Sequence, residues 1–151
     1  MTLRTLAVFA VFALLTAAAA TTGAQFMPGP WYAALAKPDW TPPNWLFGPV
    51  WTLLYVMIAV AGALAWRSAG PSLATLLWLV QMVANTLWSY LFFGLNRIDL
   101  ALADITLLWL AIVGFVATVW NRSRTAALLF VPYLLWVSFA AALNLAVFRL
   151  N

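Results

Sequence analysis

The chain has 151 residues, of which 67% are hydrophobic and only 7% are charged. This composition excludes a soluble globular domain and is typical of proteins that cross a membrane several times. Cysteine and histidine are both absent, which excludes disulfides, thiol nucleophiles, imidazole bases, zinc sites and histidine-ligated haem. The net charge of +4 comes from seven scattered basic residues, without the Lys and Arg cluster that nucleic acid requires.

Five apolar stretches are long enough to cross a bilayer as helices, since one span takes roughly 20 residues. They cover residues 3–26, 44–66, 72–95, 100–120 and 125–148. We therefore expect an all-α integral membrane protein, a five-transmembrane-helix bundle that forms a single domain over residues 1–151. Its termini should lie on opposite sides of the membrane. The basic residues divide four against three between the two sides, so charge assigns no orientation.

The first stretch also fits a second interpretation. Arg4, an apolar run and the small residues from Thr16 to Ala24 form the pattern of a secretory signal peptide with its cleavage site. The apolar run is longer than a typical signal-peptide core, so we interpret residues 3–26 as a membrane span.

One connection is much longer than the others. Residues 27–43 are rich in proline and also contain Trp31, Tyr32 and Trp40. A segment this aromatic is not a solvated linker, and we expect it to fold back as a lid over one end of the bundle. The remaining connections are short, so successive helices should run antiparallel.

Tryptophan is unusually frequent, with ten residues in the chain. In membrane proteins it normally lies at the level of the lipid headgroups, and Trp66 and Trp120 fit this role at the ends of spans. Five others lie well inside apolar stretches, namely Trp51, Trp78, Trp88, Trp109 and Trp136. Indoles at this depth indicate a flat, aromatic, poorly soluble ligand held between helices.

The third span carries two carboxamides and an indole on one helical face. Gln81, Asn85 and Trp88 are spaced at i, i+4 and i+7. Unpartnered carboxamides in hydrocarbon cost several kcal/mol, so this face must look into the protein. We assign Gln81 to hydrogen bonding between helices, and Asn85, which is nearer to Trp88, to a pocket.

Two further spans repeat a four-residue spacing. The residues are Phe47, Trp51 and Tyr55 in the second span, and Pro132, Trp136, Ala140 and Asn144 in the fifth. The first series predicts an aromatic wall. In the second, the small Ala140 one turn beyond Trp136 predicts a hollow beside the indole, and close helix packing is the alternative.

The chain has three acidic residues, and no two are placed as a general acid and base pair. Asp39 lies in the long connection, and Asp99 is predicted to be the N-cap of the fourth helix. Asp104 lies about one turn inside that helix, where an ionisable group is costly. We expect it to snorkel toward the helix N-terminus; a buried hydrogen bond or a proton-linked role are the alternatives.

These residues form a recognisable series along the chain. It consists of Trp31-Tyr32, Lys37-Pro-Asp-Trp40-Thr-Pro-Pro-Asn-Trp-Leu-Phe47, Trp51-Thr-Leu-Leu-Tyr55, Gln81, Asn85, Trp88, Phe92-Phe93, Pro132-Tyr133-Leu-Leu-Trp136 and Leu143-Asn144. With this series the chain resembles a bacterial member of the translocator protein family, also called tryptophan-rich sensory proteins or peripheral benzodiazepine receptors. The resemblance covers all five spans in order.

The resemblance implies a five-helix bundle, usually homodimeric, whose pocket is closed by the first loop. Family ligands include porphyrins such as protoporphyrin IX, isoquinoline carboxamides and benzodiazepines, and no cofactor is required. Carried over position by position, the ligand-binding residues are Thr22, Gly23, Tyr32, Trp51, Asn85, Trp88, Trp136, Ala140 and Leu143. Animal members also bind cholesterol through a tyrosine before a basic residue, and here Phe148 precedes Arg149, which puts cholesterol binding in doubt.

Three functions follow as hypotheses. The leading one is a receptor or transporter for tetrapyrroles in a bacterial cell-envelope membrane, with Lys37 meeting a propionate. Metal-free porphyrin is favoured over haem because the chain lacks histidine and cysteine. The second is a light-dependent porphyrin-degrading enzyme in which Trp51 and Trp136 are the catalytic candidates. The third is a sensor of tetrapyrrole or stress status that acts through partner proteins.

Overall fold

The computed structural model describes residues 2–151, and this part of the chain is helical without strands. The elements are α1 (Leu3–Gly23), α2 (Pro30–Ala34), the 3₁₀ turn η1 (Asn44–Leu46), α3 (Phe47–Ala69), α4 (Leu73–Ser89), the π-helical turn η2 (Tyr90–Gly94), α5 (Ile98–Val119) and α6 (Arg124–Leu150). Five of the helical segments are long and apolar enough to cross a membrane. The predicted all-α class with five spans is confirmed.

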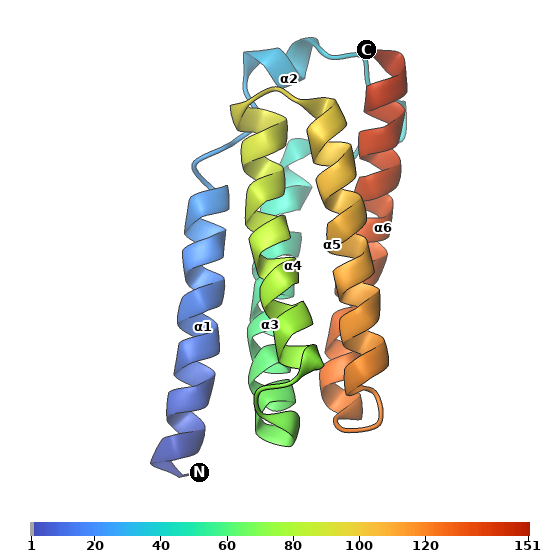
Figure 1. The fold of residues 1–151 in the computed structure, drawn as a ribbon. Coiled ribbons are helices and arrows are strands. Elements are labelled where there is room, and N and C mark those ends of the chain that lie inside the picture. The colour runs from blue at the N-terminus through green and yellow to red at the C-terminus, as the bar shows by residue number, and fades with distance from the viewer. Residues whose placement is uncertain (1) are drawn as a thin grey trace.

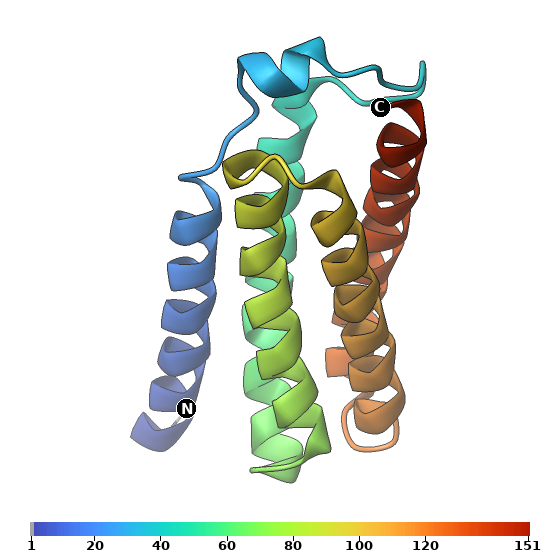
Figure 2. The ribbon, with the colours of Figure 1, turned by 45° about the horizontal axis from the view of Figure 1, so that its top comes forward.

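The long helices stand side by side and run alternately up and down (Figure 1). Helix α1 lies at the edge of the bundle and packs on α3 and α4, whereas α5 packs on both α4 and α6. The two ends of the chain lie at opposite ends of the bundle in both views (Figures 1 and 2). This agrees with an odd number of spans.

The observed helix ends differ from the predicted ones by a few residues. Helix α1 ends at Gly23 instead of continuing to Phe26, because the next backbone bonds are turns, with Phe26 N donating to Gly23 O. Helix α3 continues to Ala69 and stops at Gly70, whose positive φ of 59° is one that glycine adopts without strain.

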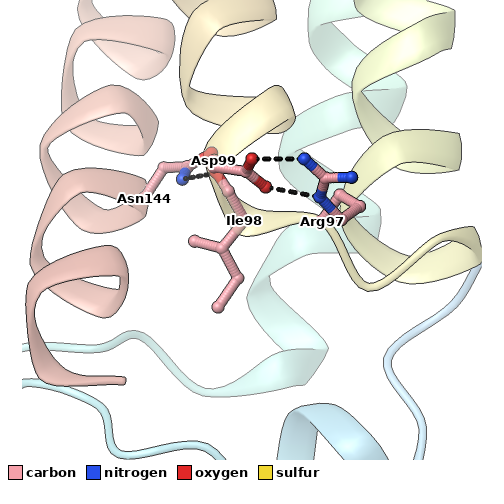
Figure 3. A network of polar contacts seen from close by, with 4 residues as sticks. All are labelled: Arg97, Ile98, Asp99 and Asn144. Atoms are coloured by element: carbon pink, nitrogen blue, oxygen red, sulfur yellow. Dashed lines mark hydrogen bonds and ion pairs between the residues drawn. The ribbon is translucent and has the colours of Figure 1, made fainter.

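The predicted N-cap of the fourth long helix is wrong. Helix α5 begins at Ile98, so Arg97 is its N-cap and Asp99 is already its second residue. The Asp99 carboxylate accepts hydrogen bonds from Nε and Nη2 of Arg97 at 2.8 and 2.5 Å (Figure 3). Asp99 still contributes to the helix start, because a negative charge in the first turn interacts favourably with the helix dipole.

One end of the bundle has a solid core. Trp78 is fully buried there, and its indole Nε1 donates to the backbone oxygen of Ile58 at 2.9 Å. The Trp78 ring packs edge-on against Phe12 of α1 with 4.7 Å between centroids. A Cβ at Gly62 would lie 2.5 Å from both rings, so glycine is what allows α1, α3 and α4 to approach here.

The long connection folds back over the other end of the bundle, where α2 lies across the helix ends (Figures 1 and 2). Tyr32 of α2 is buried. The Asn151 side chain also binds the connection, because its Oδ1 accepts from Ala36 N and its Nδ2 donates to Ala36 O, both at 3.0 Å. A lid must also open and close, and this movement stays a prediction.

Candidate ligand-binding cavity

A cavity of about 510 Å³ lies between the long helices at the end covered by α2. This volume is within the range of small-molecule sites, roughly 300–1,000 Å³. The structure brings eight of the nine predicted ligand-binding residues to its wall: Gly23, Tyr32, Trp51, Asn85, Trp88, Trp136, Ala140 and Leu143. They come from five different elements, so only the folded bundle brings them together.

Thr22 is the predicted residue that the structure does not place on the cavity wall. Its side chain is exposed, and its hydroxyl donates to the backbone oxygen of Ala18 at 2.9 Å. Successive helical residues point about 100° apart, so Gly23 faces the cavity while Thr22 faces outward.

Three indoles line the cavity from three helices: Trp51 of α3, Trp88 of α4 and Trp136 of α6. Each is held by another ring of the wall. Trp51 lies 5.3 Å from Tyr55, Trp88 stacks on Phe92 at 5.0 Å, and Trp136 meets Phe47 edge-on at 5.8 Å. Because these pairs fix the indoles, the cavity has a preformed aromatic wall.

Two of the five deep indoles do not reach the cavity. Trp78 belongs to the solid core described above. Trp109 lies on the outer surface between α5 and α6, where its Nε1 donates to Ser138 Oγ at 2.8 Å. Neither was among the predicted ligand-binding residues, and a hydrogen bond to a neighbouring helix satisfies the N–H of each.

The floor of the cavity is a chain of hydrogen bonds across three helices. The Tyr55 hydroxyl donates to Asn85 Oδ1, Asn85 Nδ2 donates to the Tyr133 hydroxyl, and Tyr133 donates to Gln81 Oε1, each at 2.9 Å. Gln81 Nε2 then donates to Trp78 O at 2.8 Å. The predicted interhelical role of Gln81 is confirmed, whereas Asn85 has two roles, since it both lines the cavity and joins α3, α4 and α6.

A second network holds the Trp88 indole. Its Nε1 donates to Asn144 Oδ1 at 3.0 Å, and Asn144 Nδ2 donates to the backbone oxygen of Ile98 at 3.2 Å (Figure 3). Sequence reasoning placed Asn144 on the face of Trp136 and missed its pairing with Trp88. Ile98 begins α5, so this network links α4, α5 and α6 at the covered end.

Two buried polar atoms have no hydrogen-bond partner within residues 2–151: Trp136 Nε1 and Asp104 Oδ2. Asp104 is only 7% exposed, so the snorkelling interpretation is wrong. The side chain stays inside because α5 packs on both α4 and α6 along this face, and its neighbour Ile105 lines the cavity. The proton-linked role of Asp104 stays a prediction.

Lys37 does not contribute to the cavity wall. Its ammonium donates to the backbone oxygens of Tyr32, Leu35 and Ala33 at 2.7, 2.8 and 3.2 Å, and it lies 4.8 Å from the centre of the Tyr32 ring. Lys37 therefore satisfies the last carbonyls of α2. In this arrangement the Lys37 ammonium is engaged by backbone carbonyls, and its contact with a ligand carboxylate stays a prediction.

Tyr32 and the phenylalanines after Trp88 connect α2 to the bundle. The Tyr32 ring lies 6.0 Å from Phe92 and 5.5 Å from Phe93, and burial raises the pKa of its hydroxyl above the ordinary value. Phe92 and Phe93 line the cavity but were not among the predicted site residues. The signal for Phe92 was its position one turn after Trp88.

Comparison with known proteins gives consistent matches along the whole chain. Residues 5–150 match the family described as TspO/MBR. The chain is 42% identical to Protein CrtK of Rhodobacter capsulatus over 150 residues, which cover 97% of this chain and 94% of that protein. It is 38% identical to the tryptophan-rich sensory protein of Cereibacter sphaeroides over 145 residues, 96% and 92% of the two chains. It is also 36% identical to the human translocator protein over 137 residues, 85% and 81% of the two chains.

Proposed function

Since the chain belongs to the TspO/MBR family, we propose that it binds tetrapyrroles such as protoporphyrin IX, and similar flat hydrophobic molecules, between its helices. The protein is a multi-pass membrane protein. Its family membership and its aromatic clusters fit a binding or transport role in the membrane.

The convergence of Trp51, Trp88 and Trp136 on one cavity is the observation that carries this proposal. Rigid aromatic rings give a flat ligand a large contact area at a small entropic cost, and offset stacking adds about 0.5–1.5 kcal/mol per pair. The wall is already held by ring pairs and hydrogen bonds, so binding a macrocycle would require little ordering of side chains.

Titration of the protein in lipid nanodiscs with protoporphyrin IX tests the proposal. We expect saturable quenching of tryptophan fluorescence, and weaker binding by the double variant Trp51→Phe/Trp136→Phe. Trp120→Phe is the control, because Trp120 is exposed at the end of α5 and does not line the cavity. Absence of quenching, or equal affinity of the double variant, would contradict the proposal.

Light-dependent porphyrin degradation is the second candidate. It is supported by the position of Trp51 and Trp136 on the cavity wall, where both indoles would be near a bound macrocycle. The test is to illuminate the protein with excess protoporphyrin and to count the molecules consumed per protein. Catalysis predicts many turnovers with intact indoles, whereas loss of both indoles after about one equivalent would indicate photosensitised damage.

We also propose a homodimer. Ala13, Ala17 and Thr21 are exposed on the outer side of α1, where small side chains permit close approach of a second helix. Ala17→Phe should weaken association in cross-linking experiments, and Ala18→Phe, at an exposed position one step around the helix, is the matched comparison. Equal dimer yields from both variants would place the interface elsewhere.

A further inference from the structure

The cavity carries no formal charge. Among the residues that the structure describes, its wall has aromatic, aliphatic and neutral polar side chains but no lysine, arginine, aspartate or glutamate. Carboxylic acids are ionised at neutral pH, so a porphyrin with free propionates brings negative charges to a wall without cations. The following inference rests on the proposed function and specifies which part of a ligand enters the cavity.

Three cations lie within a few residues of a lining residue in sequence, and none of them lines the cavity: Lys37, Arg97 and the exposed Arg149. Lys37 donates to three backbone carbonyls, and Arg97 pairs with Asp99. The one acidic side chain next to a lining residue is Asp104, beside Ile105, and its Oδ2 has no partner. An acid at this position offers no attraction for an anion.

Several neutral donors of the wall are engaged as well. Asn85 Nδ2 donates to Tyr133, Trp88 Nε1 to Asn144, and Asn144 Nδ2 to Ile98 O. Trp136 Nε1 is the buried side-chain donor without a partner among residues 2–151. Burial disfavours the ionised form of a carboxylate, and neutral donors without a cation offset only part of the hydration that it loses.

The side of the cavity between α1 and α3 is different, because lining residues there are exposed. Ala24 and Met27 follow the end of α1, and Asn44, Gly48 and Thr52 surround the start of α3. These five residues are here called the mouth. Ala24 and Asn44 lie at the ends of membrane spans, so an ionised group beside them can lie at the level of the lipid headgroups.

We infer that the cavity takes only the uncharged part of its ligand and leaves every ionised group at the mouth. A macrocycle whose carboxylates lie along one edge can bind in this way. A macrocycle with carboxylates around its whole perimeter cannot, because at least one of them would enter the wall of Trp51, Trp88 and Trp136.

Four porphyrins test this inference on the full chain in phosphatidylcholine nanodiscs. They are protoporphyrin IX, with both carboxylates on one edge, its dimethyl ester, coproporphyrin III, with a carboxylate on each pyrrole, and its tetramethyl ester. Empty nanodiscs measure how each compound partitions into lipid. After this correction we expect similar affinities for protoporphyrin IX and both esters, and binding weaker by about tenfold or more for the coproporphyrin tetra-acid.

Equal corrected affinities of the coproporphyrin tetra-acid and its tetramethyl ester would overturn the inference and leave the proposed function intact. Failure of all four compounds to bind would overturn the proposed function, and the inference with it. The two failures are therefore distinguishable.

A second, independent test adds a positive charge at the mouth. Asn44 is exposed, lines the cavity and lies at the start of the turn before α3. Asn44→Lys should bind protoporphyrin IX several-fold more tightly and its dimethyl ester with unchanged affinity, since only the acid has an anion at the mouth. Asn44→Gln is the uncharged control. Equal effects of Asn44→Lys on acid and ester would contradict the placement of the carboxylates.

Discussion

The Tyr55 hydroxyl donates a hydrogen bond of 2.9 Å to Oδ1 of Asn85, and this bond joins the aromatic wall of α3 to the polar face of α4. Tyr55 also holds Trp51, with 5.3 Å between ring centroids. Both Tyr55 and Asn85 line the cavity. The same contact therefore holds two helices together and sets the floor on which a ligand would rest.

Tyr55→Phe should lower the free energy of unfolding by about 1–2 kcal/mol. An interhelical hydrogen bond in a membrane contributes about 0.6 kcal/mol on average, but a buried acceptor left unpaired costs about 1–3 kcal/mol, and this second cost dominates. Denaturation in mixed micelles measures the change. Thr52→Val is the control, because the exposed Thr52 hydroxyl bonds only within its own helix; equal losses would argue against the network.

Asn144→Ala should destabilise the bundle by about 1–3 kcal/mol, because it leaves the Trp88 N–H without its acceptor and removes the interhelical bond to the Ile98 carbonyl. The matched comparison is Ser138→Ala, which removes the partner of Trp109 on the outer surface. We expect the smaller loss there, since Ser138→Ala removes one interhelical hydrogen bond and Asn144→Ala removes two. The prediction is wrong if Ser138→Ala proves the more damaging of the two.

Gly62→Ala should destabilise the protein by about 1–3 kcal/mol, because the new methyl group would overlap the Phe12 and Trp78 rings at 2.5 Å. Gly48→Ala in the same helix is the control, since a Cβ there meets nothing within 4 Å. In that open position alanine should be neutral or should stabilise α3 by up to about 1 kcal/mol. Thermal unfolding measures the stability of both variants. Equal stability of Gly62→Ala and Gly48→Ala would contradict the described packing at Gly62.

The fold and much of the cavity wall were predictable because a membrane constrains the length and the hydropathy of each span, and both can be read from the sequence. Length and hydropathy define the spans, and four-residue spacing shows which residues share a helical face. This reasoning selected Trp51, Asn85, Trp136 and Ala140, all of which line the cavity. It works within one helix, because the geometry of a single helix is known in advance.

What the sequence did not predict is which residues of other helices pack against a given helical face. Trp78 and Trp88 are both deep indoles of α4, yet one packs on Phe12 and the other lines the cavity. The partners on other helices distinguish them, since Trp78 contacts α1 and α3 whereas Trp88 bonds to α6. The burial of Asp104 likewise depends on the packing of α5 against both of its neighbours. Spacing along one helix contains no information about these distances.

Alkaline pH should weaken the attachment of α2. Burial raises the pKa of the Tyr32 hydroxyl above its ordinary value of 10.0, so the unfolded chain loses this proton first. Above pH 10 the unfolded state therefore binds fewer protons than the folded state, and stability falls as pH rises. The contribution of the Tyr32 hydroxyl to stability is fully present below pH 10 and is lost as the pH rises through the higher pKa of the folded state. Tyr32→Phe should show a shallower decline between about pH 9 and 11 in denaturation experiments; identical slopes would contradict the assignment.

The contact between Asn151 and Ala36 predicts how the connection over the cavity is held. Asn151→Ala removes both 3.0 Å bonds to the Ala36 backbone and the 2.9 Å bond from Nδ2 to Val147 O. Each bond contributes about 0.5–1.5 kcal/mol, so we expect faster hydrogen exchange at Ala36 and about fivefold faster release of bound protoporphyrin IX. Asn121→Ala, in the exposed turn at the opposite end, is the control. If Asn151→Ala speeds exchange without changing release, the connection covers the cavity but does not control exit from it.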